Sequence, residues 1–94
     1  MNVGLCVVEF HLVGSHSLKE KRRVLRHLKD KIRAKFNVAV AEVDHQDLWQ
    51  RATLGMVGIS ASREPLESCF LQIRSILERE IPGDLASFHV EFLS

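Results

Sequence analysis

The sequence predicts a single α+β domain over residues 1–94, with strands and helices in the order βαββαβ. Two segments repeat apolar side chains at helical spacing. Four other segments are rich in aliphatic and β-branched residues and are separated by turn-forming residues. A chain of 94 residues that is 46% hydrophobic is long enough for one domain with its own core.

The first half contains one expected strand and one expected helix. The strand covers 3–12, and the loop 13–16 follows it. Ser17 and Glu20 have the spacing of a capping box, in which each side chain bonds a free amide of the first helical turn. We therefore expect a helix from Leu18 to Lys35 or Phe36. Its apolar stripe consists of Leu18, Leu25, Leu28, Ile32 and Phe36.

The second half contains three expected strands and another helix. Strands are expected at 37–43 and 49–60, joined by a turn at 44–47, and at 85–93 after a turn at 82–84. The helix is expected over 63–80, with Ser62 as its cap and Pro65 in its first turn, where the missing amide hydrogen does little harm. Its buried face consists of Leu66, Cys69, Phe70, Ile73, Ile76 and Leu77.

Right-handed crossovers restrict this order to few topologies, of which the ferredoxin-like βαββαβ sandwich is favoured. In that fold two helices cover one face of a four-stranded antiparallel sheet. The other face has no helix on it, and monomers rarely expose several hundred Å² of apolar surface. We therefore expect a homo-oligomer, most simply a dimer through the open sheet face. The residues expected on that face are Val3, Leu5, Val7, Val57 and Ile59.

The charge distribution is the most informative functional feature. Residues 16–35 hold nine of the thirteen Lys and Arg residues against two acids, a balance of +7, while the remaining residues carry −6. At 100° per residue, six cations fall within one ~120° sector of the first helix. We call this set the basic ribbon: Lys19, Arg22, Arg23, Arg26, Lys29 and Arg33.

Two long segments resemble a known family. SLKEKRRVL and FNVAVAEVDHQDLWQRATLG resemble the signature of the bacterial YlxP-like family, whose function is largely uncharacterised. The resemblance implies a ferredoxin-like domain. It also implies a gene context, in some bacteria, among genes for translation initiation and ribosome maturation, which favours an RNA or ribosome connection by association.

The basic ribbon predicts a non-enzymatic protein that binds RNA or the ribosome through phosphate contacts. A solvated helix face and a contact with a second copy remain alternatives, the latter as a purely oligomeric interaction module. A further alternative is a small anionic-ligand or phosphoryl-processing site at the loop that starts the helix. Its residues would be Gly14, Ser15, His16, Ser17 and Lys19.

Other sites are weakly indicated. Glu42, Asp44, His45 and Asp47 could bind a metal, but Asp side chains that stabilise the turn explain the pattern as well. We expect no metal, no cofactor and no catalytic residue. The leaderless N-terminus, the absence of a membrane-length apolar run and two reduced cysteines, Cys6 and Cys69, predict a cytoplasmic protein without membrane contact.

Two single residues stand out. Lys21 lies in the apolar sector of the first helix, where its stem is expected to follow the core edge and its ammonium to reach solvent or a strand carboxylate. A ligand role for Lys21 is the alternative. Trp49, in a chain with only six aromatic residues, is expected in the core or at an interface.

Overall fold

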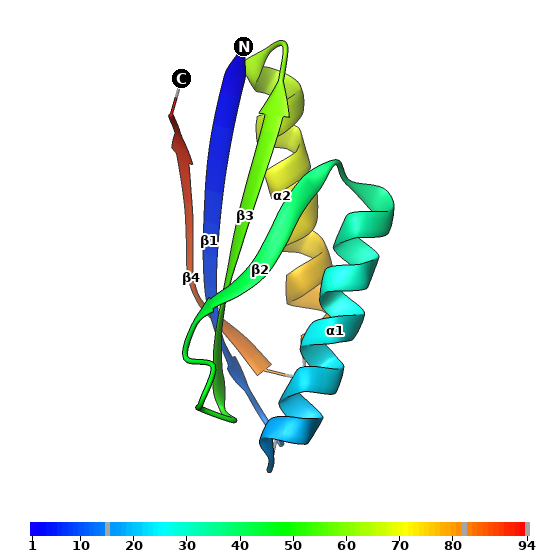
Figure 1. Ribbon diagram of the computed structural model, residues 1–94, viewed down its shortest axis with the longest axis vertical. Helices are drawn as coiled ribbons and strands as arrows, with labels where there is room; N and C mark the ends of the chain where they lie inside the picture. The colour runs from blue at the N-terminus through cyan, green and yellow to red at the C-terminus, as the bar shows by residue number, and fades with distance from the viewer. Residues whose placement is uncertain (15, 82, 94) are drawn as a thin grey trace.

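A computed structural model describes residues 1–14, 16–81 and 83–93 and confirms the βαββαβ order (Figure 1). The elements are β1 (Asn2–Leu12), α1 (Leu18–Lys35), β2 (Val38–Asp44), β3 (Arg51–Ser60), α2 (Arg63–Glu80) and β4 (Gly83–Phe92). Both helices have the bounds expected from their apolar periodicity. The strand bounds differ from expectation by one or two residues.

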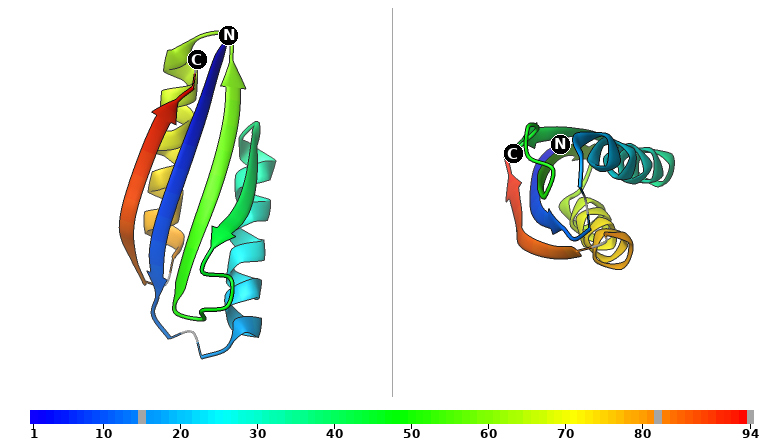
Figure 2. Two further views of the ribbon diagram at one scale, coloured as in Figure 1. Left: turned by 60° about the vertical axis from the view of Figure 1, so that its left-hand side comes forward. Right: turned by 90° about the horizontal axis from the view of Figure 1, so that it is seen from below.

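The four strands form one antiparallel sheet in the order β2-β3-β1-β4, which is the ferredoxin-like topology. Figures 1 and 2 show both helices on the same face of the twisted sheet, with α1 alongside β2. The sequence prediction of fold and topology is therefore confirmed.

The core lies between this sheet face and the two helices. It includes Phe10 and Met56 from the sheet and Leu28, Ile32 and Phe70 from the helices. Leu25, Ile73 and Leu77 are also buried as expected, while Cys69 is only half-buried. The alternation of buried and half-buried residues along β1 follows the two-residue period of a strand.

The last strand begins earlier than expected, at Gly83. This residue pairs with Leu12, and a Cβ added to it would lie 1.9 Å from the carbonyl oxygen of His11. Only glycine permits this approach of two backbones. The residues read as a turn therefore belong to the sheet; Pro82 lies outside the described residues.

The two helix caps have different outcomes. Ser17 occupies the N-cap of α1, and its hydroxyl oxygen accepts a hydrogen bond from the Glu20 amide at 3.1 Å. Ser62 occupies the N-cap position of α2 as expected, but its side chain makes no cap hydrogen bond.

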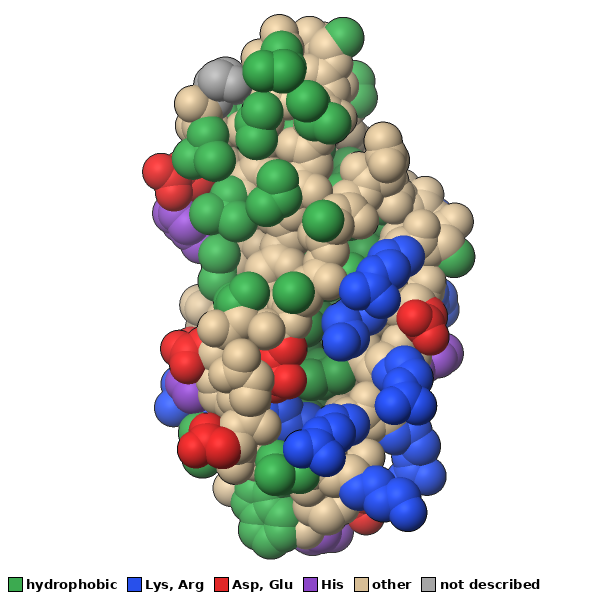
Figure 3. Space-filling model, in the orientation of Figure 1, with side chains coloured by type: hydrophobic (Ala, Val, Ile, Leu, Met, Phe, Trp, Pro, Cys, Tyr) green, Lys and Arg blue, Asp and Glu red, His purple; other side chains and the backbone are tan. Residues whose placement is uncertain are grey.

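The outer sheet face carries the aliphatic residues expected there. Val57 and Ile59 of β3 are 44% and 56% exposed, and they pair with Leu5 and Val3 of β1, which are half-buried. Figure 3 shows apolar side chains spread over this part of the surface. Within the described residues, neither helix is apolar enough over its length to span a membrane.

Candidate nucleic-acid interface

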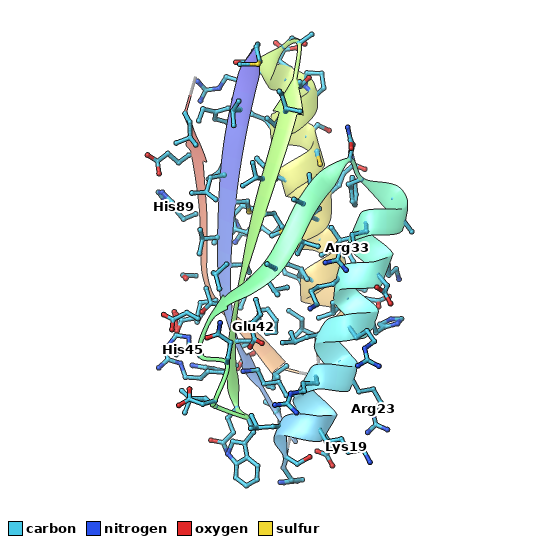
Figure 4. All side chains as sticks on the ribbon, in the orientation of Figure 1. Lys19, Arg23, Arg33, Glu42, His45 and His89 are labelled. Carbon is cyan, nitrogen blue, oxygen red and sulfur yellow. The ribbon has the colours of Figure 1, made fainter. Side chains whose placement is uncertain are left out.

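The basic ribbon lies on the solvent side of α1. Lys19, Arg22, Arg23 and Arg26 are exposed, and Lys29 is half-buried. Figure 4 shows Lys19 and Arg23 pointing away from the fold, and Figure 3 shows blue side chains gathered along α1. Because the apolar stripe lies beside the ribbon and is buried against the sheet, the ribbon is turned toward solvent.

These five cations have no acidic partner within residues 1–14, 16–81 and 83–93. Every ion pair of the described chain involves other basic residues. On α2 the pattern is the reverse, since Arg63 pairs with Glu67 and Arg74 with Glu78, each one turn apart. Two of the three arginines of α2 are therefore paired within their own helix, whereas these five cations of α1 are available for an external anion.

Arg33, the sixth residue of the ribbon, has a different environment. Its guanidinium donates a hydrogen bond to the Val40 carbonyl at 3.0 Å and lies 3.8 Å from an Asp30 carboxylate oxygen. Figure 4 shows the side chain directed toward β2. Arg33 thus links α1 to the edge strand, and its contribution to nucleic-acid binding stays a prediction.

The helix surface is hollowed where the ribbon begins. An open hollow of about 580 Å³ is lined by Lys19, Arg22, Arg23 and Arg26 together with Ser17 and Glu20. Four of its six lining residues are cationic. The hollow is therefore suited to an anionic group that contacts several side chains at once.

Lys21 is the residue whose position the sequence explains least. It is only 1% exposed, and its ammonium lies 2.8 Å from the Glu42 carboxylate. It also donates hydrogen bonds to the carbonyl oxygens of His45 at 2.5 Å and Leu48 at 2.6 Å. Of the two expected destinations, solvent is wrong and the strand carboxylate is confirmed.

This buried ammonium ties the first turns of α1 to the loop between β2 and β3. The loop turns at His45, whose positive φ of 62° is uncommon for a residue other than glycine. The His45 amide bonds the Asp44 carboxylate at 2.8 Å, and the His45 ring lies 2.9 Å from the Thr53 hydroxyl. Three sets of contacts therefore stabilise this loop.

The sequence suggested that Trp49 belongs to the third strand, but it lies in this loop, before β3. It is 44% exposed, so of the two expected positions the core is wrong and an interface stays a prediction. The strand starts two residues later, at Arg51. The preceding carbonyl, that of Leu48, bonds Lys21, which separates this stretch from the strand ladder.

The loop before α1 is a capped turn in the residues described. Gly14 has a φ of +80°, which favours glycine, and Ser15 lies outside the described residues. The His16 amide donates to the Glu20 carboxylate at 2.8 Å. Because this carboxylate already accepts a hydrogen bond from an amide before the helix, fewer free amides remain to bind an anion than the sequence suggests. The anion site there stays a prediction.

Two of the three acidic residues considered as metal ligands have other partners. Glu42 pairs with Lys21, and Asp44 bonds the backbone of its own turn, as the turn interpretation of Asp44 predicted. No group of three His, Cys, Asp or Glu side chains with ligand geometry occurs in the described part of the chain.

Glu9 on the outer sheet face forms an ion pair with Arg51 of β3. The Arg51 guanidinium holds the pKa of the Glu9 carboxyl below its usual value. The pair joins neighbouring strands.

The comparisons with known proteins identify the family. A family model described as "Protein of unknown function (DUF503)" matches residues 3–90. The chain belongs to the DUF503 family. It is similar to the "Uncharacterized protein YlxP" of Bacillus subtilis (strain 168), at 33% identity over 76 residues, which is 81% of this chain and 83% of that protein. The YlxP-like resemblance of the sequence is confirmed.

A solved structure described as "protein YJCS" has a similar fold. The alignment covers 98% of this chain and 99% of that one, with a TM-score of 0.57 and 7% sequence identity. At this identity the similarity concerns the fold alone. This DUF503 member is therefore a ferredoxin-like domain of a family whose description assigns no activity.

Proposed function

We propose that this protein binds RNA, as a free molecule or within the ribosome, through the basic ribbon of α1. The observation that carries the proposal is the set of five cations without acidic partners in the described chain: Lys19, Arg22, Arg23, Arg26 and Lys29. Three of them are arginines, whose planar guanidinium forms two hydrogen bonds with one phosphate. The choice of RNA over DNA rests on the gene context that the family resemblance implies. Binding of such RNA would place the protein in the cytoplasm.

The repulsion between the cations of the ribbon favours a binding function for them over a role in solubility alone. Like charges one turn apart, such as Arg22 and Arg26, destabilise a helix by a few tenths of a kcal/mol. Lys19 also lies in the first turn, at the positive end of the helix dipole. The paired arginines of α2 each have a carboxylate one turn away and so avoid repulsion between like charges. An anionic partner offsets the repulsion on α1.

Salt dependence tests the proposal directly. If five phosphates of a single strand are neutralised, the logarithm of the affinity falls with a slope of about −3.5 against the logarithm of salt, which is about a hundredfold between 50 and 200 mM. The measurement is fluorescence anisotropy of labelled RNA, single-stranded and duplex. Absence of binding near 50 mM salt would refute the proposal.

The chain supplies a matched control. The α1 variant replaces three arginines of the ribbon with Gln: Arg22, Arg23 and Arg26. The α2 variant removes the same number of charges from the other helix by replacing Arg63, Arg74 and Arg79 with Gln. We expect the α1 variant to lose most of its binding and about two units of slope. The α2 variant should bind within about threefold of the wild type. Equal losses in both variants would show that net charge, and not the ribbon, drives binding.

We also propose that the outer sheet face pairs with a second copy of the chain. Val57 and Ile59 are exposed next to Leu5 and Val3, in the middle of a face without a helix. A two-fold axis brings such a face onto itself. Light scattering should give twice the 10.7 kDa chain mass. Val57→Lys should halve it, while Leu71→Lys, at an exposed position of α2, should not. A wild-type mass of one chain would exclude the pairing.

A further inference from the structure

An exposed indole lies on the loop that the Lys21 ammonium bonds to the first turns of α1. The carbonyl before Trp49, that of Leu48, bonds the Lys21 ammonium at 2.6 Å. The carbonyl after it, that of Gln50, accepts from the Leu12 amide at 2.9 Å. The Trp49 backbone is therefore fixed on both sides, to α1 and to β1, and its side chain is 44% exposed.

Trp49 differs from the other apolar residues on the surface. All five phenylalanines are buried or half-buried. The other large apolar side chains exposed in the described chain are aliphatic or Met. Among these exposed apolar side chains, only the indole offers a flat face on which a nucleobase can stack. Lys21 lies between Lys19 and Arg22 in the sequence of α1, so the loop that it fixes is bonded to the helix at the level of the ribbon's first cations.

We propose that Trp49 is a stacking platform for an unpaired base of single-stranded RNA whose phosphates lie on the basic ribbon. The proposal rests on the proposed function and specifies the form of its RNA. In a duplex every base face is covered by neighbouring bases, so a duplex contacts the ribbon alone. A single strand contacts both the cations and the indole. Lys21 acts as a positioning residue, because it holds the loop against the helix.

The absence of competing chromophores makes the test direct. The chain has one Trp and no Tyr, so its emission reports on Trp49 alone. Titration with a short single-stranded oligouridine should quench this emission, with a midpoint equal to that of the anisotropy of the labelled RNA. A duplex of the same length should bind without quenching.

Variants separate stacking from charge. Trp49→Ala should weaken single-strand binding about tenfold, leave duplex binding within about twofold, and keep the salt slope. Trp49→Phe should retain most of the affinity because it keeps a ring. Leu71→Ala, which removes an exposed apolar side chain from α2, should have no effect. Because Trp49 is outside the core, its replacement leaves the fold intact.

The outcomes distinguish this inference from the proposed function. Binding seen by anisotropy without a change in Trp49 emission, or equal affinities of wild type and Trp49→Ala, would overturn the stacking platform and leave the ribbon in place. No RNA binding at all would overturn both. Emission that changes with protein concentration and not with RNA would overturn the platform and assign the indole to a contact between copies.

Discussion

Removal of the Lys21 ammonium should be the most damaging single change on α1. Lys21→Met keeps an unbranched apolar stem of nearly the same length and removes the ammonium. The Glu42 carboxylate, 17% exposed, would lose its counter-ion, and the carbonyls of His45 and Leu48 would lose their donor. Removing one partner of a buried pair costs about 3–5 kcal/mol, because the remaining charge stays buried.

This loss is large compared with the stability of a small domain. Domains are stable by about 5–15 kcal/mol, so the variant should fold at room temperature with a reduced margin. For a chain of this size each kcal/mol corresponds to about 4–8 °C, which predicts a fall in Tm of at least about 12 °C. Urea unfolding followed by circular dichroism gives the free energy, and Trp49 emission reports whether the loop has moved.

Two further variants make the result specific. Lys19→Met removes an exposed cation from the same turn and should change the stability by less than about 0.5 kcal/mol. The double variant Lys21→Met with Glu42→Gln should recover part of the loss, because the buried carboxylate becomes neutral. A loss below about 1 kcal/mol for Lys21→Met would equal that of an exposed ion pair and would refute the reasoning.

Three other predictions follow from local contacts. Lys31 and His27 bond the Glu80 carboxylate and lower its pKa below the usual 4.5, so the stability that this carboxylate contributes is present above that pH and is lost as the pH falls through the pKa of the folded state. The urea midpoints of wild type and Glu80→Gln should therefore converge in acid. A constant difference between the midpoints would contradict this. Gly58→Ala should destabilise by about 1–3 kcal/mol in urea unfolding, because the new Cβ would lie 2.6 Å from Leu66, whereas Gly55→Ala, 3.0 Å from a Val43 methyl at the sheet edge, should cost less. Burial raises the pKa of Cys6 to about 12, so iodoacetamide should alkylate the half-buried Cys69 first, as mass spectrometry would show; faster reaction of Cys6 would mean that the core opens locally.

The sequence predicts the elements well because local patterns determine them. The heptad-like spacing of Leu25, Leu28 and Ile32 requires a helix with one buried face, and Ser17 and Glu20 define its start. The order of the elements then leaves few topologies. The unpaired cations are also predictable, because α1 has only two acids among its charged residues.

The missed features depend on contacts between distant residues. The acceptors of Lys21 lie 21 to 27 positions later in the chain, so no local pattern shows that its ammonium is enclosed. The exposure of Trp49 follows from the same contacts, because the bonded Leu48 carbonyl precedes it. Arg33 belongs to the ribbon by helical angle, yet its guanidinium donates a hydrogen bond to a carbonyl of the neighbouring β2.

The uneven distribution of charge gives the molecule an electric dipole that its net charge of +1 and isoelectric point near 7.9 do not reveal. Residues 16–35 carry +7 and the remainder −6. The amides at the start of α1 add partial positive charge at the end where Lys19, Arg22 and Arg23 lie. A nearby polyanion therefore exerts a torque on the protein and turns this end toward itself before contact. A nearly neutral protein thus approaches such a partner in a preferred orientation.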